Sequence, residues 1–372
     1  MTRVRVLNVI GSLGVGGAET YLSRVSPALR ELGVDVEICA LDRVGALVAH
    51  LEAAGILVHG TRFSDRSRGQ TVRKQIPTLV RTVADVRALV RRGRFDIVHS
   101  YLFFADLVAT AAVATLPGIR MVTSRRAEHA WRHRSVLYEH WLELASNLLA
   151  DELIANSKRV LEDVLRYERF VPRRRTVIYN GIDVSALPSA RPGSERSRLR
   201  LVSVGALAPR KGYEYALRAI RCILDGGFDA HLDVVGSGPD ERMLERLTSE
   251  LCLTANVTFS GERDPRPHLA GADLFILASR QEGFSNALLE AMGASLPCIV
   301  TDVGGNAEAI VDGSGGHVVP PGDPAALADA IIDLASDPER LIACGEFNRR
   351  RVEERFTLQA SAHHLARWYT SY

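Results

Sequence analysis

The segment Ser279–Glu290 brings two carboxylates and several backbone amides to one place. Glu282 is expected at the end of a buried strand, and Ser285 with Asn286 can cap the helix that carries Glu290 on its second turn. One carboxylate can accept hydrogen bonds from ribose hydroxyls, the other can meet a sugar, and the amides at the helix start can bind phosphate. The spacing therefore favours a nucleotide or sugar site, although two unrelated surface glutamates would give the same short pattern.

A second candidate is the loop Gly205–Gly212, where Arg210 and Lys211 are adjacent cations between an expected strand and an expected helix. Positive charge at a helix start opposes the helix dipole, so the arrangement favours an anion between the two side chains. We interpret it as a clamp for a diphosphate. The turn after the next strand contributes Gly236 and Gly238, which alone are more typical of a plain turn.

Near the N-terminus, the loop Gly11–Glu19 contains Gly16 and Gly17 between the first expected strand and its helix. Glycines let backbone amides approach an anion closely, and the helix dipole favours a phosphate there. The loop is no dinucleotide fingerprint, because Glu19 stands where the third glycine of that pattern belongs. A tight turn between strand and helix explains part of the pattern in any case.

A basic stretch follows the expected strand Arg120–Thr123 and begins with Arg125 and Arg126. The planar fork of an arginine suits phosphate or carboxylate, and strand ends present groups to the ligand-binding edge of a parallel sheet. We therefore predict an anionic ligand here, either a lipid-linked diphosphate or an acidic sugar. Tyr101 and His129 complete this candidate group.

Arg132, Arg134 and the neighbouring Trp131 continue the basic stretch. Basic residues beside aromatic ones suit an anionic bilayer, so we expect these residues further out, towards a membrane surface. A solvated helix start with aromatic residues in the core explains the stretch almost as well.

The bulk properties are those of a globular protein of two domains. The chain has 372 residues, of which 47% are hydrophobic and 24% charged, and its net charge of +2 gives no reason to expect nucleic acid. Residues 1–190 hold 27 Lys+Arg against 19 Asp+Glu, whereas the remainder holds 19 against 25. A basic first half fits an anionic ligand or membrane surface there, and arginine enrichment typical of a GC-rich genome is the plainer explanation.

The five cysteines are scattered and odd in number, and they are expected to be free, buried thiols in a reducing compartment: Cys39, Cys222, Cys252, Cys298 and Cys344. The sequence shows neither a secretory signal before the first strand nor an apolar run long enough to span a bilayer. We expect a cytoplasmic protein that is at most peripheral at the inner face of the membrane.

Short β-branched runs alternate with longer amphipathic stretches, the pattern of parallel sheets wrapped by helices. The first series has expected strands at Val4–Ile10, Val34–Leu41, Asp96–His99 and Arg120–Thr123, with helices at Ala18–Leu32 and Ile76–Val90. The second has expected strands at Leu201–Val204, His231–Val235, Val257–Phe259, Leu274–Leu277, Cys298–Thr301 and Gly316–Val319. The fold class is α/β, with two Rossmann-like domains.

The expected boundaries follow from composition. Residues 185–200 are rich in Pro, Ser, Gly and Arg without an apolar period, and are expected to link the domains. Residues 1–184 form the N-terminal domain and residues 201–354 the C-terminal one, and a C-terminal helix of about residues 355–372 is expected to pack back on the N-terminal domain.

With Gly304–Glu308 and Gly316–Gly322, the run from Gly205 to Pro338 resembles the donor domain of the family-4 retaining glycosyltransferases, which have the GT-B fold. The Gly16–Glu19 loop and Asn180–Asp183 are similar to the N-terminal half of that family. The resemblance covers essentially the full chain. It implies two domains with mostly parallel sheets that face each other across a cleft, the first on the acceptor side and the second binding a nucleotide sugar.

The resemblance also implies roles for the residues named above. Glu290 would hold the donor ribose, Glu282 would lie by the transferred sugar, and Lys211 would bind the diphosphate with Arg210. Donor contacts would further come from Gly16, Gly17, Gly236, Gly238, Gly283, Phe284, Ser285 and Asn286. The reaction would retain the anomeric configuration without a metal or other cofactor, and a UDP-sugar is favoured over a GDP-sugar.

Three departures from the family pattern affect the expected site. The family usually has Arg where this chain has Ala206, and Arg210 would have to supply that charge. A His-x-His after the fourth strand is replaced by His99-Ser-Tyr101, and a histidine after the next strand by Ser124-Arg-Arg126. No general base can be named, but an oxygen of the leaving phosphate can take the acceptor proton.

We therefore predict a bacterial, cytoplasmic hexosyltransferase of polysaccharide or glycoconjugate biosynthesis. It would move a sugar from a nucleoside-diphosphate sugar to a hydroxyl of a glycan, lipid-linked or small-molecule acceptor. Two alternatives stay open: a nucleotide-sugar epimerase of the same fold, or a catalytically weak partner subunit that binds sugar nucleotides.

Overall fold

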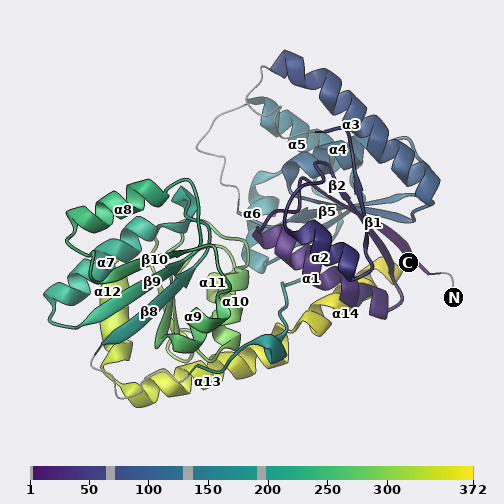
Figure 1. Ribbon diagram of the computed structural model, residues 1–372. Helices are drawn as coiled ribbons and strands as arrows, with labels where there is room; N and C mark the ends of the chain where they lie inside the picture. The colour runs from purple at the N-terminus through teal and green to yellow at the C-terminus, as the bar shows by residue number, and fades with distance from the viewer. Residues whose placement is uncertain (1–2, 64–71, 129–136, 191–197, 372) are drawn as a thin grey trace. The chain divides into compact units, whose positions relative to one another are not determined.

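The computed structural model describes residues 3–63, 72–128, 137–190 and 198–371. It divides into two compact units (Figure 1). The first comprises Met1–Gly181 together with Leu358–Tyr372, and the second comprises Ile182–Thr357. Each unit is α/β, with helices on both faces of a parallel sheet, as the alternating pattern predicted.

The described residues of the first unit form a seven-stranded sheet in the order β3-β2-β1-β4-β5-β6-β7, and every described pair is parallel. Its strands are β1 (Arg5–Ile10), β2 (Asp35–Ala40), β3 (Leu57–Gly60), β4 (Ile97–Tyr101), β5 (Arg120–Arg125), β6 (Glu152–Ala155) and β7 (Arg174–Val177). β3, β6 and β7, the three four-residue strands of this sheet, were not predicted from the sequence. Each contains a polar or glycine residue at its start or end, so none of them is a continuous apolar run.

The helices of the first unit lie in two layers. They are α1 (Gly17–Glu31), α2 (Leu47–Ala53), α3 (Val72–Gly93), α4 (Phe103–Val113), α5 (Leu137–Leu149), α6 (Lys158–Tyr167) and α14 (Leu358–Thr370). α3, α4 and α5 pack side by side on one face, while α1 packs with α2 and α14 on the other (Figure 1). Leu22, Val25 and Leu29 of α1 are fully buried because their spacing places them on one helical stripe.

The C-terminal helix α14 belongs to the first unit. Arg120 donates from its guanidinium to the carbonyl of Tyr369 at 2.8 Å, and the hydroxyls of Tyr21 and Ser361 are 3.0 Å apart. The guanidinium of Arg174 lies 4.6 Å from the ring centroid of Trp368. These contacts tie α14 to the sheet and to α1.

The described residues of the second unit form a six-stranded parallel sheet in the order β10-β9-β8-β11-β12-β13. The strands are β8 (Leu199–Val204), β9 (Ala230–Val235), β10 (Val257–Gly261), β11 (Leu274–Leu277), β12 (Cys298–Thr301) and β13 (Gly316–Val319). Each contains the corresponding run predicted from the sequence. β11 and β12 are buried at every residue, so their sequences are almost continuously apolar and easy to recognise.

The helices of the second unit are α7 (Tyr213–Asp225), α8 (Glu241–Glu250), α9 (Arg266–Gly271), α10 (Asn286–Gly293), α11 (Asn306–Ala309), α12 (Pro324–Ala335) and α13 (Pro338–Arg355). α7, α8 and α12 cover one face of the sheet, and α9, α10 and α11 lie on the other (Figure 1). α7 begins after a 3-10 turn at Pro209–Lys211, which places the two adjacent cations between β8 and α7.

The first part of the segment expected to link the domains belongs to the second unit. Residues 182–190 pack on the second unit, where the amide of Ala190 donates to the carbonyl of Ala294 at 2.7 Å. The expected linker overlaps this segment and the first residues of β8, and residues 191–197 lie outside the described part of the chain. Local backbone bonding of this kind leaves no periodic signal in the sequence.

The structure also bears on the expected state of the cysteines and on membrane-spanning helices. All five cysteines are free, but only Cys39, Cys298 and Cys344 are buried, so the prediction of buried thiols is wrong for Cys222 and Cys252. Among the described residues, no helix combines the length and the apolar character needed to cross a bilayer.

Candidate functional site

The loops that follow β8 and β9 at the carboxyl edge of the second sheet pack directly against each other. The amide of Leu207 donates to the carbonyl of Ser237 at 2.9 Å. Gly236 has φ 146°, and a Cβ at this position would lie 2.1 Å from the carbonyl oxygen of Gly205. At Gly238 a Cβ would lie 2.3 Å from the carbonyl oxygen of Leu207. Both positions require glycine because of this backbone packing, before any ligand is considered.

Lys211 and Glu282 form a nearly buried ion pair at this edge. Lys211 Nζ lies 2.5 Å from Glu282 Oε1, and the two side chains are only 10% and 8% exposed. Ser279 Oγ donates to the same carboxylate oxygen at 2.7 Å. The structure thus joins the cationic loop and the Glu282 segment, two motifs that the sequence analysis identified separately.

The backbone strengthens this connection. The carbonyl of Arg210 accepts hydrogen bonds from the amides of Arg280 at 2.8 Å and Gln281 at 3.3 Å. Arg210 itself is exposed, and so is Ala206. The edge therefore offers one shielded cation and one solvent-facing cation within a short turn.

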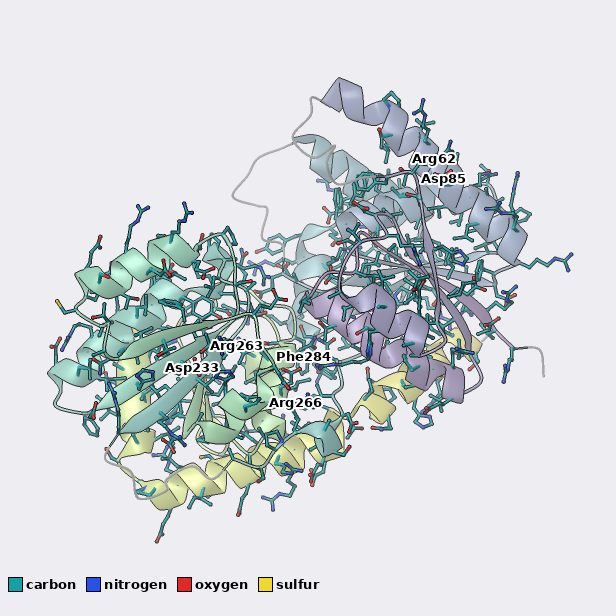
Figure 2. All side chains as sticks on the ribbon, in the orientation of Figure 1. Arg62, Asp85, Asp233, Arg263, Arg266 and Phe284 are labelled. Carbon is teal, nitrogen blue, oxygen red and sulfur yellow. The ribbon has the colours of Figure 1, made fainter. Side chains whose placement is uncertain are left out.

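α10 begins as predicted. Ser285 is its N-cap, and its hydroxyl accepts from the amide of Leu288 at 3.3 Å. Asn286 is the first residue of the helix, and Glu290 lies on its second turn with 9% of its surface exposed. Phe284, labelled in Figure 2, is buried, and its ring centroid lies 5.2 Å from that of Phe356.

The turn after β12 packs against the backbone of the Glu282 segment. Gly304 has φ 52°, and a Cβ there would lie 2.4 Å from the carbonyl oxygen of Glu282. The amide of Gly305 donates to the carbonyl of Gly283 at 2.7 Å. The sequence analysis missed the positioning roles of Gly304 and Ser279, although Ser279 opens the Glu282 motif and Gly304 opens the Gly-Gly pair that carries part of the resemblance.

In the first unit, Gly16 is the N-cap of α1 and Gly17 its first residue. The carboxylate of Glu19 lies close to Gly16, so that a Cβ on Gly16 would be only 2.3 Å from Glu19 Oε2. Burial lowers the pKa of the Arg126 guanidinium, and electrostatic interactions with Tyr21, Tyr101 and Glu19 oppose this shift. The glycine loop and the end of β5 are therefore neighbours at the carboxyl edge of the first sheet.

Arg126 is half-buried and stacked on aromatic rings. Its guanidinium carbon lies 4.0 Å from the ring centroid of Tyr21 and 5.7 Å from that of Tyr101, and it donates to Asn180 Oδ1. Cation–π stacking of this kind fixes the direction of the guanidinium without neutralising its charge. Of the arginines predicted to meet an anion, Arg126 keeps the geometry for that role.

Arg125 is placed differently. It donates to Asp106 at 2.6 Å, to Glu168 at 2.9 Å and to Asn147 at 3.0 Å, and its side chain is 12% exposed. This internal network argues against the predicted contact between Arg125 and an anionic ligand. Arg125 and Arg126 differ because neighbouring residues at a strand end point to opposite faces of the sheet.

Tyr101 is fully buried, and its hydroxyl lies 3.3 Å from Nδ1 of His99. Burial lowers the pKa of His99 to about 3, so this imidazole is neutral at physiological pH. The burial of Tyr101 argues against direct contact with a ligand. Its ring instead lies beside the guanidinium of Arg126 and helps to position it. His129, Trp131, Arg132 and Arg134 lie outside the described residues.

The family model described as Glycosyltransferase Family 4 matches residues 15–186, and that described as Glycosyl transferases group 1 matches residues 198–337. A D-inositol 3-phosphate glycosyltransferase of Thermobispora bispora is 27% identical over 97% of this chain and 91% of its own. An alpha-maltose-1-phosphate synthase of Mycolicibacterium smegmatis is 26% identical over 92% of each chain.

Solved structures agree on the fold. A sucrose-phosphate synthase from Thermosynechococcus elongatus superposes with a TM-score of 0.84 at 20% identity, covering 99% of this chain and 98% of that one. The Anabaena protein HepE, in complex with UDP-glucose, superposes with a TM-score of 0.84 at 20% identity over the whole of both chains. The two family models match in chain order, and the chain forms two α/β units with parallel sheets. The chain therefore belongs to glycosyltransferase family 4 and is a glycosyltransferase of the GT-B fold.

Proposed function

We propose that this protein transfers a hexosyl group from a UDP-sugar to a hydroxyl of an anionic acceptor, with retention of anomeric configuration and without a divalent metal. The observation that carries the proposal is the Lys211–Glu282 pair beside the start of α10, at the carboxyl edge of the second sheet. This edge is where open α/β sheets bind ligands. The solved complexes of HepE with UDP and UDP-glucose support the choice of donor.

On the donor side, Lys211 and Arg210 meet the diphosphate. Glu282 holds Lys211 in place before the donor binds, so the Lys211 ammonium is already oriented and largely shielded from solvent. Electrostatic interactions are stronger in such a shielded site than in water. Arg210 is exposed and supplies the second positive charge, because Ala206 stands where the family usually has an arginine.

Two carboxylates divide the remaining donor contacts. Glu290 accepts hydrogen bonds from the ribose hydroxyls, and Glu282 lies by the transferred sugar with the amides of Gly283–Asn286. The packed loop at Gly236 and Gly238 borders the nucleotide, and the amides of Gly16 and Gly17 in the first unit are proposed to bind a phosphate.

On the acceptor side, Arg126 binds the anionic group. Its guanidinium is held by stacking on Tyr21 and by Asn180, so it keeps its charge while losing little freedom when the acceptor binds. The inositol 3-phosphate and maltose 1-phosphate in the names of two relatives support an anionic acceptor or product.

The chemical step needs no protein base in this proposal. As the bond between the sugar and the diphosphate breaks, charge grows on the leaving phosphate oxygen, which takes the proton of the attacking hydroxyl. The new glycosidic bond forms on the same face of the sugar. Lys211, Arg210 and the helix amides stabilise the growing negative charge. We place the reaction in the cytoplasm, a location that the free thiols of the chain suit.

Donor binding tests the proposal directly. Calorimetry with UDP, GDP, UDP-glucose and GDP-mannose should show tighter binding of the uridine nucleotides. Glu290→Ala should weaken UDP binding by about 1–3 kcal/mol, the usual size of a lost charge-assisted hydrogen bond. Unchanged UDP affinity in this variant would rule out the ribose assignment.

A further inference from the structure

Exposed apolar side chains gather where α5 and α6 end. Leu148 and Leu149 close α5 with 59% and 43% of their surfaces exposed. Leu165 and Tyr167 in the last turn of α6 are 45% and 38% exposed, and Phe170 just beyond it is 62% exposed. Isolated exposed apolar residues are ordinary, whereas a contiguous group marks an interaction site.

These residues form one surface because the two helix ends touch. Nδ2 of Asn147, in the last turn of α5, donates to the carbonyl of Arg169 at 3.1 Å and to Glu168 Oε2 at 2.8 Å. Leu148 directly follows Asn147, and Phe170 directly follows Arg169. We call the exposed residues Leu148, Leu149, Leu165, Tyr167 and Phe170 the α5–α6 apolar surface.

The backbone holds Phe170 in an unfavourable conformation that keeps the ring outside. Its φ is 57°, in the left-handed region that costs a non-glycine residue conformational energy. The next residue, Val171, packs with Val160 and Val164 in the core. The chain thus anchors one side chain and exposes the adjacent phenyl ring, and nothing in the core of the unit explains that exposure.

The surroundings of the surface are strongly basic. Residues 158–175 contain seven Lys+Arg and three Asp+Glu, and one of the three acids, Glu168, is neutralised internally by Arg125. Arg166, Arg169, Arg173 and Arg175 are exposed. Apolar side chains that can enter an interface, ringed by cations, complement an anionic bilayer rather than a neutral protein face.

We propose that the α5–α6 apolar surface and its arginines dock this protein on an anionic lipid bilayer. Docking would hold the enzyme at a membrane surface, a property that goes beyond the proposed transfer reaction.

Co-sedimentation with vesicles tests the proposal without using enzyme activity. The full-length protein should bind vesicles of phosphatidylglycerol with phosphatidylcholine at low salt, bind phosphatidylcholine alone weakly, and lose binding as salt rises, since exposed charges are then screened. The double variant Leu148→Ser/Phe170→Ser and the charge variant Arg166→Glu/Arg173→Glu should each bind anionic vesicles about tenfold more weakly.

The matched control is Met243→Ser, which removes a side chain of comparable exposure (45%) from α8 in the second unit and should bind vesicles like the wild type. Equal unfolding temperatures show that the variants are folded. UDP affinity should be unchanged in all of them, which separates this proposal from the transfer reaction. Wild-type vesicle binding in both double variants would overturn it. So would a wild-type protein that ignores anionic vesicles, or a concentration-dependent dimer in sedimentation velocity that the apolar variants abolish.

Discussion

At the scale of single residues, the site depends on how charges are paired. Lys211 is paired with Glu282, and Arg125 with Asp106 and Glu168, whereas Arg126 is stacked on Tyr21. Arg125, which is paired with two carboxylates inside the fold, stabilises the structure, whereas Arg126, which is stacked on an aromatic ring, keeps its charge for a ligand. Two arginines, one at the end of β5 and one just beyond it, therefore serve different purposes.

Replacing Glu282 separates binding from catalysis. Glu282→Gln frees the Lys211 ammonium from its carboxylate partner, so UDP should bind at least as tightly as to the wild type. Turnover should nevertheless fall by roughly 100-fold, because the carboxylate beside the transferred sugar is lost. Calorimetry and steady-state kinetics give the two values, and Glu339→Gln, an exposed acid in the first turn of α13, is the control. Weaker UDP binding together with normal turnover would contradict this role.

The two neighbouring arginines should give opposite phenotypes. Arg126→Ala should raise the KM for the acceptor, leave UDP binding unchanged and cost little stability. Arg125→Ala removes the partner of two buried carboxylates and should destabilise the fold by about 3–5 kcal/mol. Urea unfolding and acceptor kinetics distinguish the outcomes. A stable Arg125→Ala variant with a raised acceptor KM would reverse our assignment.

Asp106 should make stability depend on pH. Burial raises its pKa from 3.8 to about 7, and the nearby charge of Glu168 also raises it, while Arg125 opposes the shift. A carboxyl with a raised folded-state pKa contributes stability that is complete below its unfolded pKa and is lost as pH rises through the folded pKa. As pH rises from 3.8 to about 7, this group should therefore lower the free energy of unfolding. Urea unfolding across this range should show a weaker pH dependence in Asp106→Asn, and an unchanged slope would contradict the shift.

At the scale of elements, the loops at strand ends position the site through backbone contacts that only glycine permits. The turn after β12 supports the Glu282 segment at Gly304, and the loops after β8 and β9 interlock at Gly236. The side chains of the candidate site are thus held by the packing of loops against loops rather than by helices alone.

Gly304→Ala should displace the Glu282–Gly283 backbone and lower turnover by about tenfold, since small misplacements of catalytic groups are costly. Gly313→Ala is a matched control, because Gly313 also has a positive φ (77°) but no atom lies within 4 Å of the position of its Cβ. Both variants carry the conformational strain, so only the displacement differs. Equal kinetics in the two variants would show that Gly304 does not position Glu282.

The strands of the second unit were predictable because central strands such as β11 and β12 are largely apolar and lie between turns. The first unit was harder, since β3, β6 and β7 include polar or glycine residues and are fixed by pairing with their neighbours. The donor motifs could be located because each is a continuous stretch of sequence. The Lys211–Glu282 pair spans 71 positions, and the burial of Arg125 depends on α4, α5 and α6, so neither follows from local spacing.

At the scale of the whole molecule, the chain builds one unit, passes through the second, and returns to complete the first with α14. The returning helix buries Tyr369, whose hydroxyl lies 2.6 Å from Nδ1 of His99 behind Arg126. α14 therefore supports the edge where we propose that the acceptor binds, and the residues that we propose for the donor, Lys211, Glu282 and Glu290, lie in the second unit.

Proton NMR of the reaction tests whether the protein transfers a sugar from a UDP-sugar with retention of configuration. The protein would be incubated with UDP-glucose, EDTA and a panel of inositol and sugar phosphates, and the anomeric signal of the product followed. We predict UDP release and a new linkage with the α configuration of the donor, at a rate that EDTA does not change. A β-linked product, a reaction that EDTA abolishes and manganese restores, or conversion of the donor sugar without any acceptor would contradict the account.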